Sequence, residues 1–248
     1  MAYQAVFRRY ELKYMLTQEQ KELILREIEP YMSLDEYGRT TIRNIYFDTP
    51  NYRLIRASIE KPIYKQKLRV RSYEHATHDS TVFVEIKKKY DHVVYKRRTS
   101  LPEGEAMRWL CERKKPDVTK KQQIANEIDY FLDFYQDLRP SVFLTYEREA
   151  FFTREKSDFR VTFDDMVLCR QNDIDLTSEV YGTPILPEGN VLMELKCSGG
   201  IPLWMVEILS RERIYKTSFS KYGTAYRDII LPNRKKETVA PASEILTV

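Results

Sequence analysis

The sequence lacks any long apolar run. Nowhere does it reach the about 18 consecutive apolar residues that a membrane-spanning helix needs. The N-terminus also lacks the apolar core of a secretion signal, because Arg8 and Arg9 are followed by alternating polar residues. We therefore expect a protein that is not secreted and does not insert into a membrane by itself.

Cysteine is scarce, and its placement excludes two further classes of protein. The three cysteines, Cys111, Cys169 and Cys197, are far apart, odd in number and without a CxxC pair. This spacing argues against a disulfide framework and against a structural zinc site. It favours a reducing, cytoplasmic compartment.

Neither sign of charge is in large excess. The 248 residues include 41 Lys+Arg and 37 Asp+Glu, a formal net charge of +4. Any affinity for polyanions must therefore come from where the cations lie. Internal repeats, low-complexity linkers and sharp shifts in composition are missing too, so we expect one domain over residues 1–232 and a disordered tail over 233–248.

What the sequence has in abundance is β-strand pattern. Alternation of polar and apolar residues, rich in Val, Ile, Tyr and Phe, predicts strands at 5–14, 40–48, 63–74, 80–89, 93–99, 142–153, 159–168 and 191–197. Helix signals predict helices at 17–31, 103–113, 119–137, 202–213 and 220–230. The fold class is therefore α+β, mainly antiparallel β, with flanking helices.

Each strand can be divided into two faces, because successive side chains point to opposite sides. One face of residues 63–73 carries four cations, Lys65, Lys67, Arg69 and Arg71. The corresponding faces of the other strands carry Arg9, Glu11, Lys13, Glu85, Lys87, Lys96, Arg98, Tyr146, Arg148, Arg160, Asp164, Glu194 and Lys196. Apolar residues generally occupy the opposite faces.

The simplest interpretation is an ordinary antiparallel sheet whose charged face lies in water. The sign of the charges argues for more, because these faces hold twelve cations and four carboxylates, and like charges opposite one another across strands repel. An eight-stranded barrel would point them into a cavity, where many charge-assisted hydrogen bonds could hold a chain of phosphates. The carboxylates, foremost Glu194, then become candidate ligands of Mg²⁺ or Mn²⁺. The alternative for Glu194 is a salt bridge to a neighbouring arginine.

Several short motifs give the chain a family resemblance. They are RYELKY at 9–14, IYFDTPNY at 45–52, KLRVRSY at 67–73, VFVEIKKK at 82–89, YKRR at 95–98, TYEREAF at 145–151, FRVTFD at 159–164, LMELK at 192–196 and FSKY at 219–222. In this order they resemble the VTC domain, the polyphosphate polymerase domain among the triphosphate tunnel metalloenzymes of the CYTH-like superfamily. The resemblance covers roughly residues 5–230. It implies a CYTH-like tunnel of eight antiparallel strands, lined by basic residues and closed by helices.

The resemblance also implies an activity and a set of site residues. The activity is transfer of the γ-phosphate of ATP to a growing inorganic polyphosphate chain, with Mn²⁺ or Mg²⁺ as cofactor. Catalytic roles would fall to Lys13, Arg69, Arg71, Lys87, Arg148, Arg160 and Lys221, phosphate binding to Lys67, Lys96, Arg98, Tyr146, Lys196 and Ser220, and metal binding to Glu194 and Glu11.

Two positions depart from the family's patterns. The superfamily's ExExK signature reads Arg9, Glu11 and Lys13 here, which argues against the cyclase and thiamine triphosphatase branch. Ser218 stands where polymerases tend to have a lysine just before FSK.

Two alternative functions stay open. The same tunnel could hydrolyse tripolyphosphate or a nucleoside triphosphate, or it could be a non-enzymatic module that binds polyphosphate or inositol pyrophosphates. A nucleic-acid binder is not expected, because most tyrosines fall on the apolar faces and leave no platform for stacking bases. We assign no role to His75, His78 and His92, which fall in or near predicted turns.

Overall fold

The strands form one sheet that closes on itself. The computed structural model describes residues 6–117, 122–155 and 157–239. The strands are β1 (Val6–Thr17), β2 (Met32–Asp48), β3 (Tyr64–Tyr73), β4 (Thr81–Tyr90), β5 (Val93–Pro102), β6 (Arg139–Thr153), β7 (Arg160–Arg170), β8 (Thr183–Pro184) and β9 (Asn190–Cys197). Their order is β6-β2-β3-β4-β5-β1-β9-β7-β8, and a further pairing of β6 with β7 closes a ring of 8 strands. The predicted fold class and the eight-stranded barrel are confirmed.

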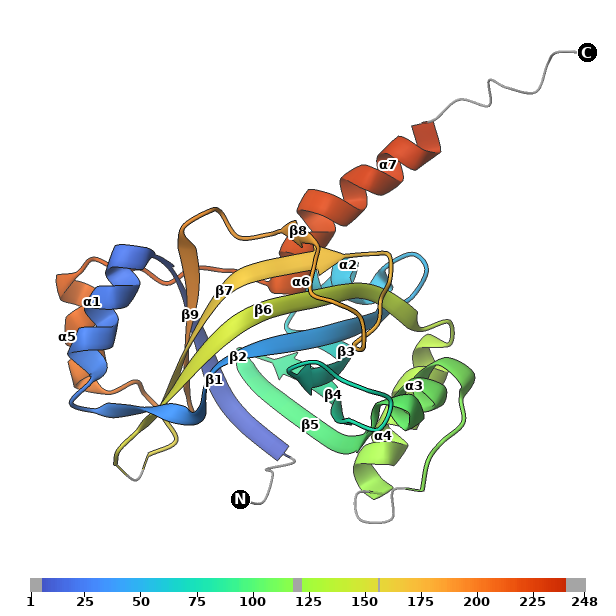
Figure 1. Ribbon diagram of the computed structural model, residues 1–248, viewed down its shortest axis with the longest axis horizontal. Helices are drawn as coiled ribbons and strands as arrows, with labels where there is room; N and C mark the ends of the chain where they lie inside the picture. Colours follow the sequence, from blue (N-terminus) through green and yellow to red (C-terminus); the bar gives the residue numbers. More distant parts are fainter. Residues whose placement is uncertain (1–5, 118–121, 156, 240–248) are drawn as a thin grey trace, which may run out of the picture.

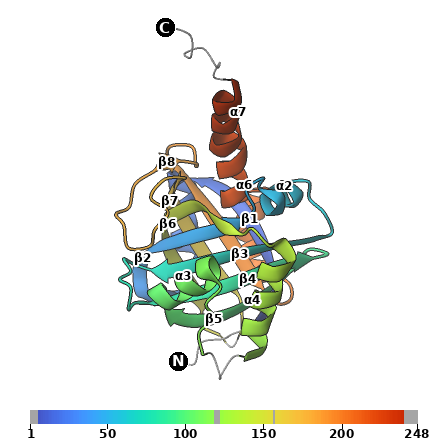
Figure 2. The same ribbon diagram turned by 90° about the vertical axis from the view of Figure 1, so that its right-hand side faces the viewer.

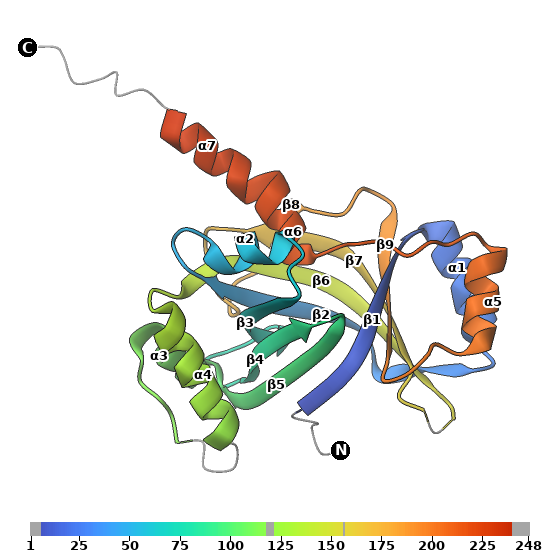
Figure 3. The ribbon, with the colours of Figure 1, turned by 180° about the vertical axis from the view of Figure 1, so that it is seen from behind.

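Most of the helices pack against the outside of this barrel, and α6 contributes Lys221 to its interior. The helices are α1 (Gln18–Ile28), α2 (Arg53–Ile59), α3 (Glu103–Glu112), α4 (Gln122–Tyr135), α5 (Leu203–Arg211), α6 (Lys221–Ala225), the π-helical turn η2 (Tyr226–Ile230) and α7 (Leu231–Val239). Helices α1 and α5 lie side by side at one end of the molecule, and α3 and α4 cover the other end (Figures 1 and 3). Figure 2 shows α3 and α4 in front of the strands. Within the described residues, no helix has both the length and the apolar content needed to cross a membrane.

Local sequence explains where some of these helices begin and end. A capping box opens α1, because the Thr17 hydroxyl accepts from the Gln20 amide at 3.2 Å and the Gln20 side chain accepts from the Thr17 amide at 3.0 Å. Pro232 does not end the last helix. The wider turn η2 precedes it, with the Leu231 N–H donating to the Tyr226 carbonyl.

The structure differs from the sequence prediction in four elements. Helix α2 and the two-residue strand β8 were not predicted. Strand β2 begins at Met32, eight residues before the predicted start at 40. The predicted tail over 233–248 is helical as far as Val239, within α7, which projects away from the barrel (Figure 1). Residues 119–121 of a predicted helix and 240–248 of the predicted tail lie outside the described residues.

Among the described residues, two of the three hydrophobic clusters lie on the outer faces of the strands. One cluster joins the outer residues of β3 and β4, such as Leu68 and Val84, to Trp109 of α3 and Ile128 of α4. A second cluster joins the outer faces of β7 and β9 to α1 and α5. A third packs α6 and η2 against the inner faces of β2 and β6, and it includes Tyr46 and Tyr146, which line the cavity. Because the apolar faces point outward under the helices, the charged faces point into the barrel.

A buried carboxylate at the end of β2 fixes α2 and α6 to the barrel. The Asp48 carboxylate is fully buried and accepts from the backbone N–H groups of Thr49 at 2.8 Å, Leu54 at 2.9 Å and Ile55 at 2.9 Å. It also accepts from the hydroxyl of Tyr222 in α6 at 3.0 Å. Asp48 therefore caps α2, whose own first residues provide no side-chain cap.

We predict that Asp48→Ala lowers the free energy of unfolding by about 3 kcal/mol, because buried donors lose their acceptor. Urea denaturation would measure the change. As a control, Asp137→Ala removes an exposed carboxylate and should change stability by less than about 0.5 kcal/mol. Equal stability of the two variants would contradict the role given to Asp48.

Candidate functional site

The inside of the barrel is a cavity of about 600 Å³ lined mainly by lysine and arginine. Every predicted site residue except Arg98 and Arg160 lines it. The lining includes Glu11, Lys13, Lys67, Arg69, Arg71, Lys87, Lys96, Tyr146, Arg148, Glu194, Lys196, Ser220 and Lys221. The barrel thus brings together side chains that the sequence spreads over more than 200 positions.

Strand register explains why these side chains meet. Lys67 of β3 lies opposite Lys87 of β4, and Lys87 lies opposite Lys96 of β5. Across another part of the ring, Lys13 of β1 lies opposite Glu194 of β9. Because paired residues point to the same side of a sheet, each pair delivers two charges to the cavity.

Asp164 of β7 joins three segments at the cavity wall. The Arg148 guanidinium donates to both of its carboxylate oxygens at 2.6 Å, and the Lys221 ammonium donates at 2.5 Å. Burial would raise the pKa of Asp164, but the charges of Arg148 and Lys221 outweigh it and lower the pKa. Lys221 is held in place by α6, whose N-cap Ser220 accepts from the Gly223 N–H.

Glu194 lies where four cations converge. Its carboxylate is 2.8 Å from the Lys196 ammonium, 3.3 Å from that of Lys13 and 3.7 Å from that of Lys221. The Arg148 guanidinium is 3.6 Å away. Burial opposes ionisation, but these charges keep the pKa of Glu194 well below its usual range. The salt bridges considered as the alternative role of Glu194 are therefore present.

The second carboxylate predicted to bind metal, Glu11, is also paired. It accepts from the Lys87 ammonium at 2.5 Å and lies 3.7 Å from the Arg9 guanidinium. Burial and the nearby charge of Glu194 would raise the pKa of Glu11, but the charges of Lys87 and Lys196 together outweigh them, and the pKa falls to about 2. Among the described residues, no three His, Cys, Asp or Glu side chains gather to hold a metal ion. A divalent ion here would depend on oxygen atoms of a phosphate ligand in addition to a carboxylate.

Arg98 and Arg160 do not line the cavity, and each lies over an aromatic ring. The Arg98 guanidinium lies 4.6 Å from the centre of the Phe83 ring and 3.8 Å from Glu85. The Arg160 guanidinium lies 4.3 Å from the centre of the Phe152 ring. Cation–π contacts of this length hold a guanidinium over the face of an aromatic ring.

The structure adds residues that the predicted set left out. Lys61, Lys65, Lys89, His92 and Lys216 line the cavity, as does Tyr46. Lys89 continues the period-two face of Glu85 and Lys87, so strand alternation alone could have found it. Tyr46 could not be found this way, because its place follows from the pairing of β2 with β3.

Tyr46 is an ionisable group among cations. Its hydroxyl lies 3.0 Å from an Arg69 nitrogen that donates to it. Burial would raise its pKa, but the charges of Arg69, Lys67 and Arg71 outweigh burial and lower the pKa to about 7. The phenol therefore loses its proton far more readily than an ordinary tyrosine.

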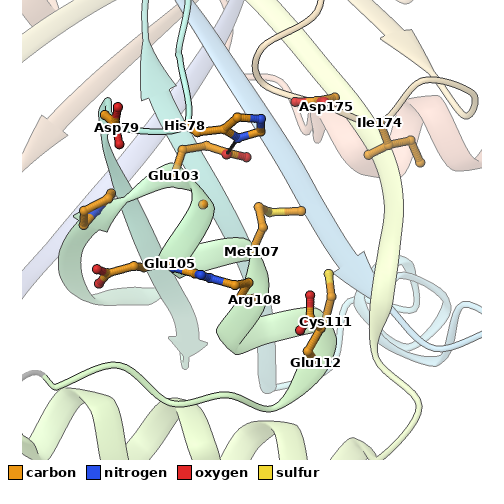
Figure 4. Close-up of a pocket in the computed structure, with 12 residues that line it drawn as sticks. His78, Asp79, Glu103, Glu105, Met107, Arg108, Cys111, Glu112, Ile174 and Asp175 are labelled. Atoms are coloured by element: carbon orange, nitrogen blue, oxygen red, sulfur yellow. Dashed lines mark hydrogen bonds and ion pairs between the residues drawn. The ribbon is translucent and has the colours of Figure 1, made fainter.

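A second pocket, of about 580 Å³, lies at the start of α3 and has the opposite charge. Its lining includes Asp79, Glu103, Glu105, Glu112 and Asp175, and the His78 ring pairs with Glu103 at 2.9 Å (Figure 4). An acidic lining repels phosphate. The barrel cavity is therefore the candidate site for an anionic ligand.

Comparison with known proteins identifies both the fold and the family. The family model of the VTC domain matches residues 8–230. A solved structure from Bacillus halodurans, provisionally named an adenylate cyclase, is 16% identical with a TM-score of 0.54, over 88% of this chain and 96% of that chain. A structure from Hippeastrum, provisionally named an adenylyl cyclase and titled as having a dominant triphosphatase activity, is 14% identical with a TM-score of 0.50, over 89% and 95%. No curated protein sequence matches the chain. These likenesses confirm the predicted CYTH-like tunnel fold.

The lysines of the cavity predict a pH dependence of anion binding. Burial, together with the charges of Lys13 and Lys87, lowers the pKa of Lys67 to about 8. Binding of an anion favours the charged lysine, so the affinity for tripolyphosphate should fall as pH rises from 7 to 9. The loss from Lys67 is about tenfold per pH unit above its pKa. Isothermal titration calorimetry at several pH values would measure it.

Lys67→Arg is the matched variant, because an arginine keeps its charge over this whole pH range. Its affinity should fall less steeply than that of the unsubstituted protein. The ligand's own titration is common to both proteins, so the difference between them reports on Lys67. Identical slopes would show that Lys67 keeps its proton throughout.

Proposed function

Because the chain belongs to the VTC domain family, we propose that it transfers the γ-phosphate of ATP to the end of an inorganic polyphosphate chain inside the barrel. The observation that supports this most strongly is the cavity of about 600 Å³ lined by lysines and arginines from six strands. A linear chain of phosphates presents an anionic oxygen on every unit, and such a lining can bind each unit by charge-assisted hydrogen bonds.

The proposed chemistry requires position and positive charge more than a covalent intermediate. In phosphoryl transfer the charge of the transition state spreads over the phosphoryl oxygens. Arg69, Arg71 and Arg148 would bind those oxygens, since a guanidinium can donate two parallel hydrogen bonds. Lys13, Lys87 and Lys221 would hold the flanking phosphates, and Arg160, outside the cavity, is left out of the proposed set.

Glu194 would hold the divalent ion that the family implies, Mn²⁺ or Mg²⁺. The donor chemistry fits, because these ions bind through one or two carboxylates together with phosphate oxygens. The bound ion would supply positive charge next to the phosphoryl group. Lys196 and Lys13, which neutralise Glu194 here at 2.8 and 3.3 Å, would turn to the phosphates.

Hydrolysis is the second candidate function. The likeness to the Hippeastrum protein, whose title reports a dominant triphosphatase activity, favours it. The same cations would stabilise the same transition state, with water as the acceptor in place of a phosphate chain. A third candidate, a binding module without turnover, is consistent with the four ion pairs of Glu194.

The test is incubation of the protein with ATP and Mn²⁺, with and without pyrophosphate as primer, followed by ³¹P NMR. We expect signals of internal polyphosphate phosphates beside ADP. Glu194→Gln, which keeps the shape but removes the charge, should abolish chain growth. Glu188→Gln alters an exposed carboxylate in the segment before β9 and should leave it unchanged. Orthophosphate without chain growth would establish hydrolysis, and binding without turnover would establish the binding module.

Arg148→Ala should lower kcat at least a hundredfold, a loss of about 3 kcal/mol of transition-state stabilisation. The reason is that Arg148 is the guanidinium that contacts both Asp164 and Glu194. Initial rates of ADP formation would measure the loss, and thermal denaturation would show whether the variant stays folded. A folded variant with unchanged turnover would remove Arg148 from the proposed mechanism.

A further inference from the structure

Four lysines of the cavity lining form no ion pair with any residue that the structure describes. We call Lys61, Lys65, Lys89 and Lys216 the lysine mouth. All four line the cavity, and Lys61 and Lys216 are exposed. Lys65 of β3 and Lys89 of β4 are direct cross-strand partners. This places two like charges side by side, which is unfavourable unless an anion compensates them.

The interior of the cavity holds carboxylates among its cations, although Lys67 there lies opposite Lys87 in the same way as Lys65 lies opposite Lys89. There every carboxylate of the charged face forms ion pairs: Glu85 with Arg69 and Lys96, Asp164 with Arg148 and Lys221, and Glu11 and Glu194 as described above. Within the described part of the chain, none of the four lysines of the mouth forms an ion pair. Lys65 donates to the Ser58 carbonyl at 3.1 Å, and Asp91 also lines the cavity.

Repulsion within the lysine mouth contributes to lowering the pKa values of Lys65 and Lys89. Burial lowers the pKa of Lys65, and the charges of Lys89, Lys13 and Lys61 lower it further. Burial likewise lowers the pKa of Lys89, with Lys87, Lys216 and Lys13 adding to the effect and Glu11 opposing it. The mouth therefore concentrates positive charge, and Asp91 and Glu11 offset it only in part.

The residue type changes along the cavity as well. Near Glu194 and Glu85 the cations include Arg69, Arg71 and Arg148, which can grip a phosphate through two parallel hydrogen bonds. The four cations that define the lysine mouth are all lysines. A lysine ammonium is a compact charge on a flexible side chain and lacks the planar donor geometry of a guanidinium. It therefore attracts a phosphate chain without fixing one phosphate unit in one orientation.

A continuous series of cations links the two regions. The Lys13 ammonium lies 3.3 Å from Glu194 and donates to the Phe219 carbonyl at 2.8 Å. Its charge also acts on Lys65, Lys67 and Lys89. Lys13 therefore lies between the proposed reaction centre and the lysine mouth.

We propose that the lysine mouth is a binding subsite for the phosphate units of a long polyphosphate chain that extend beyond the reaction centre. This inference rests on the proposed function, because it takes inorganic polyphosphate as the ligand of the barrel. The mouth binds successive units loosely and holds the chain near the centre between transfers. Tripolyphosphate, which occupies the centre, does not depend on it.

The test compares two ligands, tripolyphosphate and a long-chain polyphosphate, by isothermal titration calorimetry. Lys61, Lys89 and Lys216 are changed together to Gln, and Lys65 is kept because it also binds a backbone carbonyl. The matched control changes Lys88, Lys114 and Lys115 to Gln. These lysines pair with Glu127, Glu112 and Asp129 and are absent from the cavity lining, and the change in net charge is the same.

We expect the mouth variant to bind long-chain polyphosphate at least about tenfold more weakly and tripolyphosphate within about twofold of the unsubstituted protein. Its affinity for the long chain should also depend less steeply on salt, because fewer counterions are released. The control should keep both affinities. Equal losses for the two ligands, or equal losses in the control, would overturn the proposal.

The outcome is separable from that of the proposed function, because it requires binding and not turnover. Chain growth with an unaffected long-chain affinity in the mouth variant would overturn the subsite and leave the polymerase. Loss of long-chain affinity without any turnover would keep the subsite and overturn the polymerase. A single-stranded oligonucleotide that binds as tightly as polyphosphate, and loses as much, would mean a general polyanion surface and overturn the proposal.

Discussion

The structure depends on keeping many like charges inside a closed barrel. A charge taken out of water is costly unless an opposite charge or a hydrogen bond compensates it. The barrel meets this cost with buried carboxylates, above all Glu85 and Asp164, both fully buried and each paired with at least two cations. Two of the hydrophobic clusters lie between the outer faces of the strands and the helices. The third packs Tyr222 of α6 against Tyr46 and Tyr146 on the inner faces.

This arrangement separates stability from ligand binding. The outer clusters hold the strands in register, and register alone decides which charges meet inside. Removal of one inner cation leaves a buried carboxylate with one partner fewer. The free-energy penalty then arises from that under-compensated charge and not from lost apolar packing. The helices reach the interior mainly through α6, whose Lys221 binds Asp164 and whose Tyr222 binds Asp48.

Strand alternation predicted the barrel and most of its lining because a period of two is a strict geometric rule. It placed Lys67, Arg69 and Arg71 on one face without knowledge of any partner strand. It could not place Tyr46, which depends on which strand lies beside it. Nor could it predict that Arg98 would lie over the Phe83 ring and not line the cavity, because that depends on a contact between side chains. Helix α2 was missed because its cap, Asp48, lies at the end of the preceding strand.

The bond from Lys13 to the Phe219 carbonyl joins residues 206 positions apart. Strand β1 is made early and pairs with β9, one of the last strands to leave the ribosome. During synthesis, therefore, Lys13 of β1 leaves the ribosome well before Glu194, the carboxylate that neutralises it. Contacts so distant in sequence form slowly. Until β9 has been made, the ring cannot close, and Lys13 of β1 and Arg148 of β6 lack the carboxylate of Glu194.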